Sequence, residues 1–203
     1  MRREKPPFLF VGNHPCLDFV NTQMIVRGKL TDLLESFEDV LLWLVHTKLL
    51  TRSQADIART ELDQNETVSL LQQAKTLRST LRDVAERIAS RKPIPDSTID
   101  TINKFMSPRL GYPELVRTKA GFARSFHTVT ALKDGLLTPL AVAAVDLLCL
   151  ADFALIKKCA NAACILYFYD TTRNHGRNWC SMELCGNRMK VAAFFQRKRT
   201  RKK

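Results

Sequence analysis

Apolar residues recur at intervals of three and four through residues 31–90, the spacing that places side chains on one face of a helix. The pattern predicts three successive helices, over residues 31–45, 52–65 and 68–90. Thr31 would cap the first of these helices, and Pro93 and Pro95 would end the third. The apolar positions of the third helix are Leu70, Leu71, Ala74, Leu77, Leu81, Val84 and Ile88.

Shorter patterns complete the N-terminal three quarters of the chain. Residues 8–12 predict a short strand, and a turn at 13–15 separates it from a second apolar run over 16–20. Alternation over 112–116 and 122–129 predicts two strands of a small antiparallel sheet. Two more helices are expected, one capped by Asp96 over 96–105 and one that opens at Thr138 and Pro139. We therefore predict the α+β class, with a mainly helical N-terminal domain.

Charge divides the chain into two unequal parts. Its 203 residues are 45% hydrophobic, which is enough for a buried core, and its formal net charge is +12. Residues 155–203 hold twelve Lys and Arg against Asp170 and Glu183, a net +10, while residues 1–154 hold 20 basic and 18 acidic residues, a net +2. The sequence thus predicts a domain over 1–154 and a basic module over 155–203 that attracts polyanions.

Neither export nor membrane insertion is expected from the hydrophobic segments. The apolar run at 8–12 is too short for the core of a signal peptide. Asp146 and Asp152 interrupt the most hydrophobic segment, 140–156, and an unpaired carboxylate is costly in lipid. We therefore expect a cytoplasmic protein, in a reducing compartment where clustered cysteines bind metal more often than they form disulfides.

Four of the six cysteines follow the pattern C-x4-C-x15-C-x4-C, at Cys159, Cys164, Cys180 and Cys185. Two thiolate pairs at this separation suit one tetrahedral zinc ion. Four sulfur ligands leave no position for an activated water, so the zinc would be structural and would stabilise a module too small for a large core. Disulfides or buried free thiols are the alternative reading, and His175 is an alternative ligand.

The residues between the cysteine pairs predict a treble-clef arrangement. A strand over 165–169, a turn over 171–176 and a return strand over 177–179 would carry the second pair back to the first. Ser181 would cap a new helix, so that Cys185 projects from its first turn. The C-terminal module is thus expected to be a small treble-clef-like zinc finger.

The helix after the second cysteine pair has an apolar and a basic side on a helical wheel. Leu184, Val191 and Phe195 share the side that is expected to pack, while Lys190 and Arg197 lie opposite. Such a helix would neutralise phosphates with little sequence preference; a solvated charged face is the alternative. The candidate nucleic-acid-binding residues are Arg173, Arg177, Arg188, Lys190, Arg197, Lys198, Arg199 and Arg201.

Polar side chains near the start of the chain stand among apolar neighbours. His14, Asp18, Asn21 and Thr22 are candidate residues of a pocket that senses a small-molecule effector. The alternative, which turn statistics favour, is that Asp18 and Asn21 bond the backbone where a strand meets a helix. No G-x-S-x-G, H-E-x-x-H or phosphate-binding glycine loop occurs in the sequence, so we do not expect an enzyme.

Two sets of residues resemble known domains. The letters WCSM at 179–182 and CGNR at 185–188 are similar to the CGNR zinc finger, and the likeness extends upstream through Cys159, Cys164, Phe168 and 170–171. LDFVNT at 17–22 and LLWL at 41–44 resemble the ABATE domain that usually precedes this finger. The resemblance implies a stress-induced transcription regulator that binds DNA. Residues 177–178 are Arg-Asn where the family often has two arginines, so a phosphate contact at position 178 does not carry over from the resemblance.

The C-G-N-R motif also carries expected roles. Gly186 would let the helix approach the metal site closely, Asn187 would bond a backbone carbonyl there, and Arg188 would pair with Asp170 or with a phosphate.

Three functions compete at this stage. They are a DNA-binding regulator, an RNA-binding or ribosome-associated protein, and an adaptor whose finger binds protein. The charge favours nucleic acid, with DNA preferred over RNA. Exposure of Tyr167 and Tyr169 beside the arginines would favour RNA, because exposed aromatic rings hold single strands by stacking.

Overall fold

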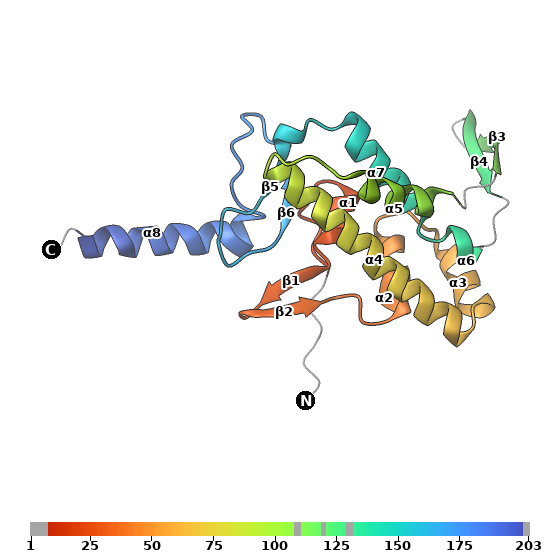
Figure 1. The fold of residues 1–203 in the computed structure, drawn as a ribbon, viewed down its shortest axis with the longest axis horizontal. Coiled ribbons are helices and arrows are strands. Elements are labelled where there is room, and N and C mark those ends of the chain that lie inside the picture. Colours follow the sequence, from red (N-terminus) through yellow and green to blue (C-terminus); the bar gives the residue numbers. More distant parts are fainter. Residues whose placement is uncertain (1–7, 108–110, 119–120, 129–131, 201–203) are drawn as a thin grey trace.

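The protein consists of a helical body and a smaller C-terminal part with a projecting helix. The computed structural model describes residues 8–107, 111–118, 121–128 and 132–200. The long helix α4 (Gln64–Ala89) runs through the body, and helix α8 (Asn187–Thr200) extends away from it (Figure 1). Within the described residues there are three two-stranded sheets. The predicted α+β class is confirmed.

The N-terminal segment differs from the prediction. Residues 8–12 form no strand, and residues 16–20 belong to helix α1 (Pro15–Val20), which His14 caps. All five residues from 16 to 20 are buried, so this helix has no polar side that would reveal its period in the sequence. Strands β1 (Gln23–Val26) and β2 (Lys29–Asp32) follow as a hairpin. Its turn residues, 27 and 28, both have positive φ, as a type I′ turn requires.

Three helices of the body begin with a capping box, in which two residues bond each other's backbone N–H groups. These helices are α2 (Phe37–His46), α3 (Arg52–Glu61) and α4. The predicted cap at Thr31 is wrong, because Thr31 lies in β2. The predicted second and third helices are confirmed, although α3 ends and α4 begins about four residues early. The capping pairs are Ser36 with Asp39, Thr51 with Gln54, and Asp63 with Glu66.

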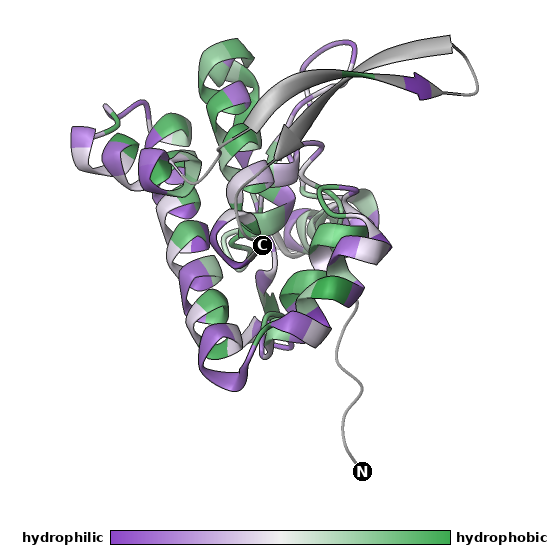
Figure 2. Ribbon diagram, turned by 90° about the vertical axis from the view of Figure 1, so that its right-hand side faces the viewer, coloured by the Kyte–Doolittle hydropathy of each residue, from purple (hydrophilic) through white to green (hydrophobic). Residues whose placement is uncertain are grey.

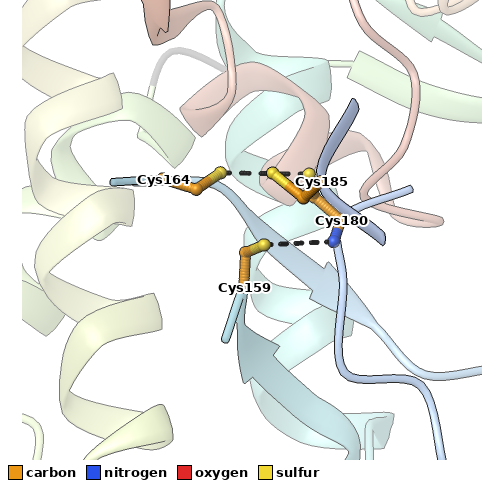
Figure 3. A group of neighbouring side chains, drawn as sticks. All are labelled: Cys159, Cys164, Cys180 and Cys185. Atoms are coloured by element: carbon orange, nitrogen blue, oxygen red, sulfur yellow. Dashed lines mark hydrogen bonds between the residues drawn. The ribbon is translucent and has the colours of Figure 1, made fainter. Parts of the chain in front are cut away.

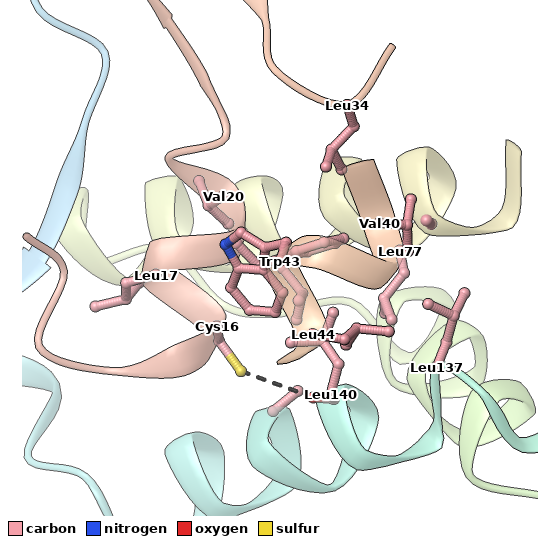
Figure 4. Close-up of a cluster of buried hydrophobic side chains, with 14 of the residues drawn as sticks. Cys16, Leu17, Val20, Leu34, Val40, Trp43, Leu44, Leu77, Leu137 and Leu140 are labelled. Atoms are coloured by element: carbon pink, nitrogen blue, oxygen red, sulfur yellow. Dashed lines mark hydrogen bonds between the residues drawn. The ribbon is translucent and has the colours of Figure 1, made fainter. Parts of the chain in front are cut away.

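The core of the body lies between α1, α2, α4 and helix α7 (Thr138–Leu150). Phe19 and Trp43 are fully buried, and their rings meet edge to face at 4.7 Å between centres. Cys16 packs in the same cluster, with its thiol 3.9 Å from the carbonyl oxygen of Leu140 (Figure 4). Hydrophilic and hydrophobic residues interchange along the helices of the body, as in helices with one buried side (Figure 2).

The remaining elements of the body agree with the prediction, except for one cap. Helix α5 (Asp96–Met106) is present, but Pro95 holds the cap position, and Asp96 is the first helical residue. Strands β3 (Gly111–Thr118) and β4 (Gly121–Thr128) pair antiparallel, as expected; position 129 of the predicted strand lies outside the described residues. The short helix α6 (Leu132–Gly135) leads into α7.

The C-terminal part starts with the 3-10 turn η1 (Phe153–Leu155) and strand β5 (Ile156–Lys158). Strand β6 (Tyr167–Tyr169) pairs antiparallel with β5, and residues 177–179 form no strand. The predicted hairpin of 165–169 with 177–179 is therefore wrong, and the observed hairpin joins β6 to β5, which precedes it in the chain. A π turn, η2 (Met182–Gly186), continues into α8. Over the described parts of the chain, no helix is both long and apolar enough to cross a membrane.

Candidate metal centre

Four cysteines from two separate segments meet at one point. Cys159 follows β5, Cys164 precedes β6, Cys180 precedes the π turn, and Cys185 lies within it. Their four Sγ atoms all lie within 4.8 Å of one another (Figure 3). All four are free thiols, which excludes the disulfide alternative in this structure.

The sulfur positions fit a tetrahedral zinc ion. Zinc–sulfur bonds of about 2.3 Å imply sulfur–sulfur separations of about 3.8 Å, and the Sγ atoms of Cys164 and Cys180 are 3.9 Å apart. A disulfide would need about 2.0 Å. The four cysteines can therefore hold one zinc ion, whose coordination they would complete without a water.

N–H groups point at the sulfurs, as expected around thiolate ligands. The backbone N–H of Cys180 donates to Cys159 Sγ at 3.4 Å, and the side-chain amide of Asn161 donates to Cys185 Sγ at 3.2 Å. Asn161 is buried, and its oxygen accepts from the backbone N–H of Ala163. Donors of this kind orient metal ligands and stabilise their negative charge. Asn161 was not among the predicted site residues, although an asparagine inside the first C-x4-C loop is a visible signal in the sequence.

The thiols compete for ionisation when they are this close together. Hydrogen bonding from the Cys180 thiol lowers the pKa of Cys164 to about 5, and the same contact raises the pKa of Cys180. Burial raises the pKa of Cys159 to about 11. The protein alone thus stabilises one thiolate at the expense of its neighbours. A divalent cation would remove this conflict, since it favours the ionised form of every ligand.

Gly186 lies close to two side chains, and a larger residue there would require Met182 to move. A Cβ atom built there would lie 2.6 Å from Met182 Sδ and 3.1 Å from a ring carbon of Trp179. The Ser181 side chain accepts from the backbone N–H of Leu184 and caps the turn. The predicted cap at Ser181 is confirmed, while the role of Gly186 in the approach of the helix to the metal site stays a prediction.

Arg177 is built into the finger and does not project toward solvent. Its guanidinium lies 4.1 Å from the centre of the buried Phe168 ring. It also donates to the carbonyl oxygens of Val11 at 2.7 Å, Trp179 at 3.0 Å and Cys180. These contacts give Arg177 a structural role, which corrects its assignment as a phosphate ligand.

The turn between the cysteine pairs is organised by the fully buried Asp170. Its carboxylate accepts from Lys157 Nζ at 2.7 Å, from Thr172 and from the backbone N–H of Arg177. Burial opposes ionisation of this carboxyl, but the hydrogen bonds prevail and hold its pKa well below the usual range. These donors occupy Asp170, and Arg188 is exposed, so its contact with a phosphate stays a prediction. His175 lies in the turn with a positive φ, and its backbone oxygen accepts from Lys157.

The four polar residues near the N-terminus bond the protein itself. The buried Asp18 accepts from the backbone N–H of Gly12 at 2.7 Å. Asn21, also buried, bonds both the N–H and the carbonyl of Tyr167, at 3.0 and 2.8 Å. The hydroxyl of Thr22 donates to a carbonyl of α1, and the ring of His14 caps that helix. These contacts match the backbone-bonding alternative, and those of Asn21 join the body to the finger.

The basic helix is exposed at every residue from Lys190 to Lys198. Val191, Phe194 and Phe195 are between 56% and 58% exposed, so the predicted packing of the Val191 and Phe195 side is wrong. Arg188 and Lys198 lie on the same side of the helical wheel as Val191 and Phe195. These two charges explain why that side of α8 is not buried. Arg173, Arg188, Lys190, Arg197 and Lys198 are exposed as predicted. The side chain of Arg199 and the whole of Arg201 lie outside the described residues.

The tyrosines named as an RNA indicator are not platforms. Tyr167 is buried and Tyr169 is half-buried. The condition that would have favoured RNA is therefore not met.

Comparison with known families agrees with this geometry. Residues 13–150 match the ABATE family model, described as "Putative stress-induced transcription regulator", and residues 156–198 match the CGNR zinc finger. Neither description is that of an enzyme. No curated protein matches the chain. The chain belongs to the ABATE family, and a CGNR zinc finger follows its ABATE domain.

Proposed function

We propose that the protein is a DNA-binding transcription regulator whose finger presents α8 to the phosphate backbone. The observation that carries this proposal is a basic helix whose residues 190–198 are all exposed. Residues 184–203 contain no Asp or Glu and eight cations: Arg188, Lys190, Arg197, Lys198, Arg199, Arg201, Lys202 and Lys203. Such a charge density attracts a polyanion and releases its condensed counterions.

The shape of α8 also suits a duplex. A helix of about 10–12 Å diameter fits the major groove, which is about 12 Å wide. Helix α8 projects from the body (Figure 1). A duplex could therefore take α8 into its major groove without meeting the ABATE domain. The exposed Phe194 and Phe195 would then lie near the base edges, where apolar side chains contact thymine methyl groups.

The zinc site would fix the direction of this helix. Cys185 belongs to the turn that continues into α8, and Cys159 follows β5, which is paired with β6. One cation that binds both would hold the start of α8 against the sheet. Arg173 lies on the turn between the cysteine pairs and would add a further phosphate contact.

Single-stranded RNA is the second candidate, because Phe194 and Phe195 are exposed aromatic rings close to cations.

The ligand-sensing role of the ABATE domain is also part of the proposal. So is a cytoplasmic location, where reduced thiols stay available to metal.

Fluorescence anisotropy over a salt series tests the assignment. Lys190→Glu plus Arg197→Glu should weaken binding to many duplex sequences by at least about tenfold and reduce the salt slope by about two. Lys48→Glu plus Arg52→Glu, exposed cations of the body, is the matched control and should bind normally. Equal losses in both variants, or none in the first, would reject α8 as the interface. Tighter binding of single-stranded RNA than of duplex DNA would select the second candidate.

A further inference from the structure

A groove of about 870 Å³ lies where the body meets the finger. One wall is the C-terminal end of α4 with the segment that follows it, from residue 88 to residue 94, and the other is formed by η1, β5 and residues 160, 177 and 178. That end of α4 and β5 lie side by side (Figure 1). A volume of this size is in the range of sites for small molecules. It is separate from the residues at 14–22 that the sequence singled out.

The floor of the groove is apolar. Ile88 and Ile156 are buried beneath it, Ile94 is half-buried, and Phe153 remains 41% exposed at its edge. An exposed phenylalanine beside buried isoleucines offers contact area to an apolar ligand at no cost in polar desolvation.

The charged side chains that line the groove are all cations, and no Asp or Glu is among its described lining residues. Lys157 is paired with Asp170, and Lys158 with Glu86. Arg91 and Lys92 are exposed at the end of α4, and their backbone N–H groups donate to carbonyls of that helix. These two side chains carry the excess positive charge toward a ligand.

We propose that this groove binds a small amphipathic anion, an apolar chain or ring system with one carboxylate or phosphate. The apolar part would lie on Ile88, Ile156 and Phe153, and the anionic head would lie at Arg91 and Lys92. This deepens the ligand-sensing part of the proposed function by naming the site and the ligand class. Binding itself does not depend on whether the finger binds DNA.

The position of the groove gives a ligand access to both parts of the protein. It would contact the segment after α4 on one side and β5 on the other, directly before Cys159. A ligand that binds across this junction stabilises the arrangement it fits, by an amount set by its affinity.

The experiment uses the full zinc-loaded chain without DNA. Octanoate and octyl phosphate are titrated at about 150 mM salt, which screens weak surface attraction, and 1-octanol serves as the neutral probe. The test variants are Arg91→Asn plus Lys92→Gln, and separately Phe153→Ser. Arg91 has a positive φ, which Asn tolerates. The matched control is Lys48→Asn plus Arg52→Gln, because Lys48 is also an exposed cation with positive φ after a helix.

At least one anion should bind saturably with a dissociation constant below about 1 mM. The double groove variant should weaken that binding by at least about tenfold, the control by less than about twofold. Phe153→Ser should weaken the binding of the octyl anions and of 1-octanol together. A preference for the carboxylate or for the phosphate identifies the head group. The proposal fails if neither anion saturates in the wild type, or if the control and groove variants lose affinity equally. A failure of DNA binding would leave these results unchanged.

Discussion

The body and the finger of this protein are stabilised in different ways. The core of the body is a large apolar cluster that includes Phe19, Trp43 and leucines of four helices. The core of the finger is a second cluster of five buried residues, and three of them are the cysteines Cys159, Cys180 and Cys185. The body can fold by burying apolar surface, whereas the finger needs its metal and its neighbours.

The finger also obtains packing from the N-terminal segment. Leu9, Val11 and Met24 lie against its cluster, while Ile156 and Tyr167 of the finger lie in the core of the body. Arg82 of α4 donates to the carbonyl of Ile165. A division of the chain at residue 154 remains a prediction, and these contacts indicate that the finger would lose support if it were cut there.

Metal removal should separate the two regions with the largest effect. Structural zinc contributes about 10–16 kcal/mol to the folding of small fingers, so Cys180→Ser or a strong chelator should unfold the finger while the body keeps its helices. Elemental analysis of the reduced wild type should find one zinc per chain. Two-dimensional NMR should show the loss of signals from residues 156–198.

Cys149→Ser is the control for this prediction, because Cys149 is an exposed cysteine outside the cluster. It should retain zinc and all finger signals. A zinc-free wild type with an intact finger would contradict the difference drawn between the two regions.

A cavity in the core of the body should lower the stability of the body and leave the zinc site of the finger intact. Phe19 is fully buried against Trp43, so Phe19→Ala should reduce the free energy of unfolding by about 3–5 kcal/mol. Zinc content at low temperature should not change. Leu42→Ala removes a 42% exposed side chain of α2 and should cost far less. If Phe19→Ala lowered the zinc content as well as the free energy of unfolding, the two regions would fold as one unit.

Local sequence chemistry predicted most of the helices and the metal ligands. Long helices such as α4 show their period because one side stays polar, and the cysteine spacing allows few other arrangements. The segment 16–20 does not show a helical period because all five of its residues are buried in α1. The first capping position was placed at Thr31 because the apolar residues at 33 and 34 continue the helical pattern, although they precede α2.

Tertiary contacts decided the features that the sequence could not show. The sequence shows Arg177 only as a cation between the cysteine pairs, but three carbonyls from two segments and the Phe168 ring surround it in the fold. The partner of β6 was also unpredictable, since β5 and 177–179 are both short and only the fold selects between them. Asn161 acquires its role from the sulfur of Cys185, 24 positions away.

Asp18 should make the body's stability depend on pH. Burial raises its pKa to about 6, against hydrogen bonds from the backbone near Gly12. The folded state therefore favours the protonated carboxyl. Its stabilising contribution is complete below the unfolded pKa, near 4, and is lost as the pH rises through about 6. A shift of this size corresponds to about 1–3 kcal/mol.

Asp18→Asn tests this contribution, since the amide oxygen can still accept from Gly12. The free energy of unfolding of the variant, measured relative to wild type by denaturant titration, should rise between pH 4 and 6.5. The difference between the two proteins isolates Asp18 from the other carboxylates. A difference that stays constant over this range would show that Asp18 remains ionised in the folded protein.

The smallest effect on the free energy of unfolding is expected from an exposed apolar residue of the finger. Phe168 and Phe195 belong to the same finger, but Phe168 is fully buried and Phe195 is 58% exposed. Phe195→Ser should change the free energy of unfolding by no more than about 0.5 kcal/mol and leave zinc content unchanged. Phe168→Ser, the matched substitution, should release zinc, because it also removes the ring on which Arg177 lies. Thermal unfolding with a zinc indicator measures both. A large loss of stability in the Phe195 variant would mean that α8 packs against something in solution, so that its exposed side is not free for a nucleic acid.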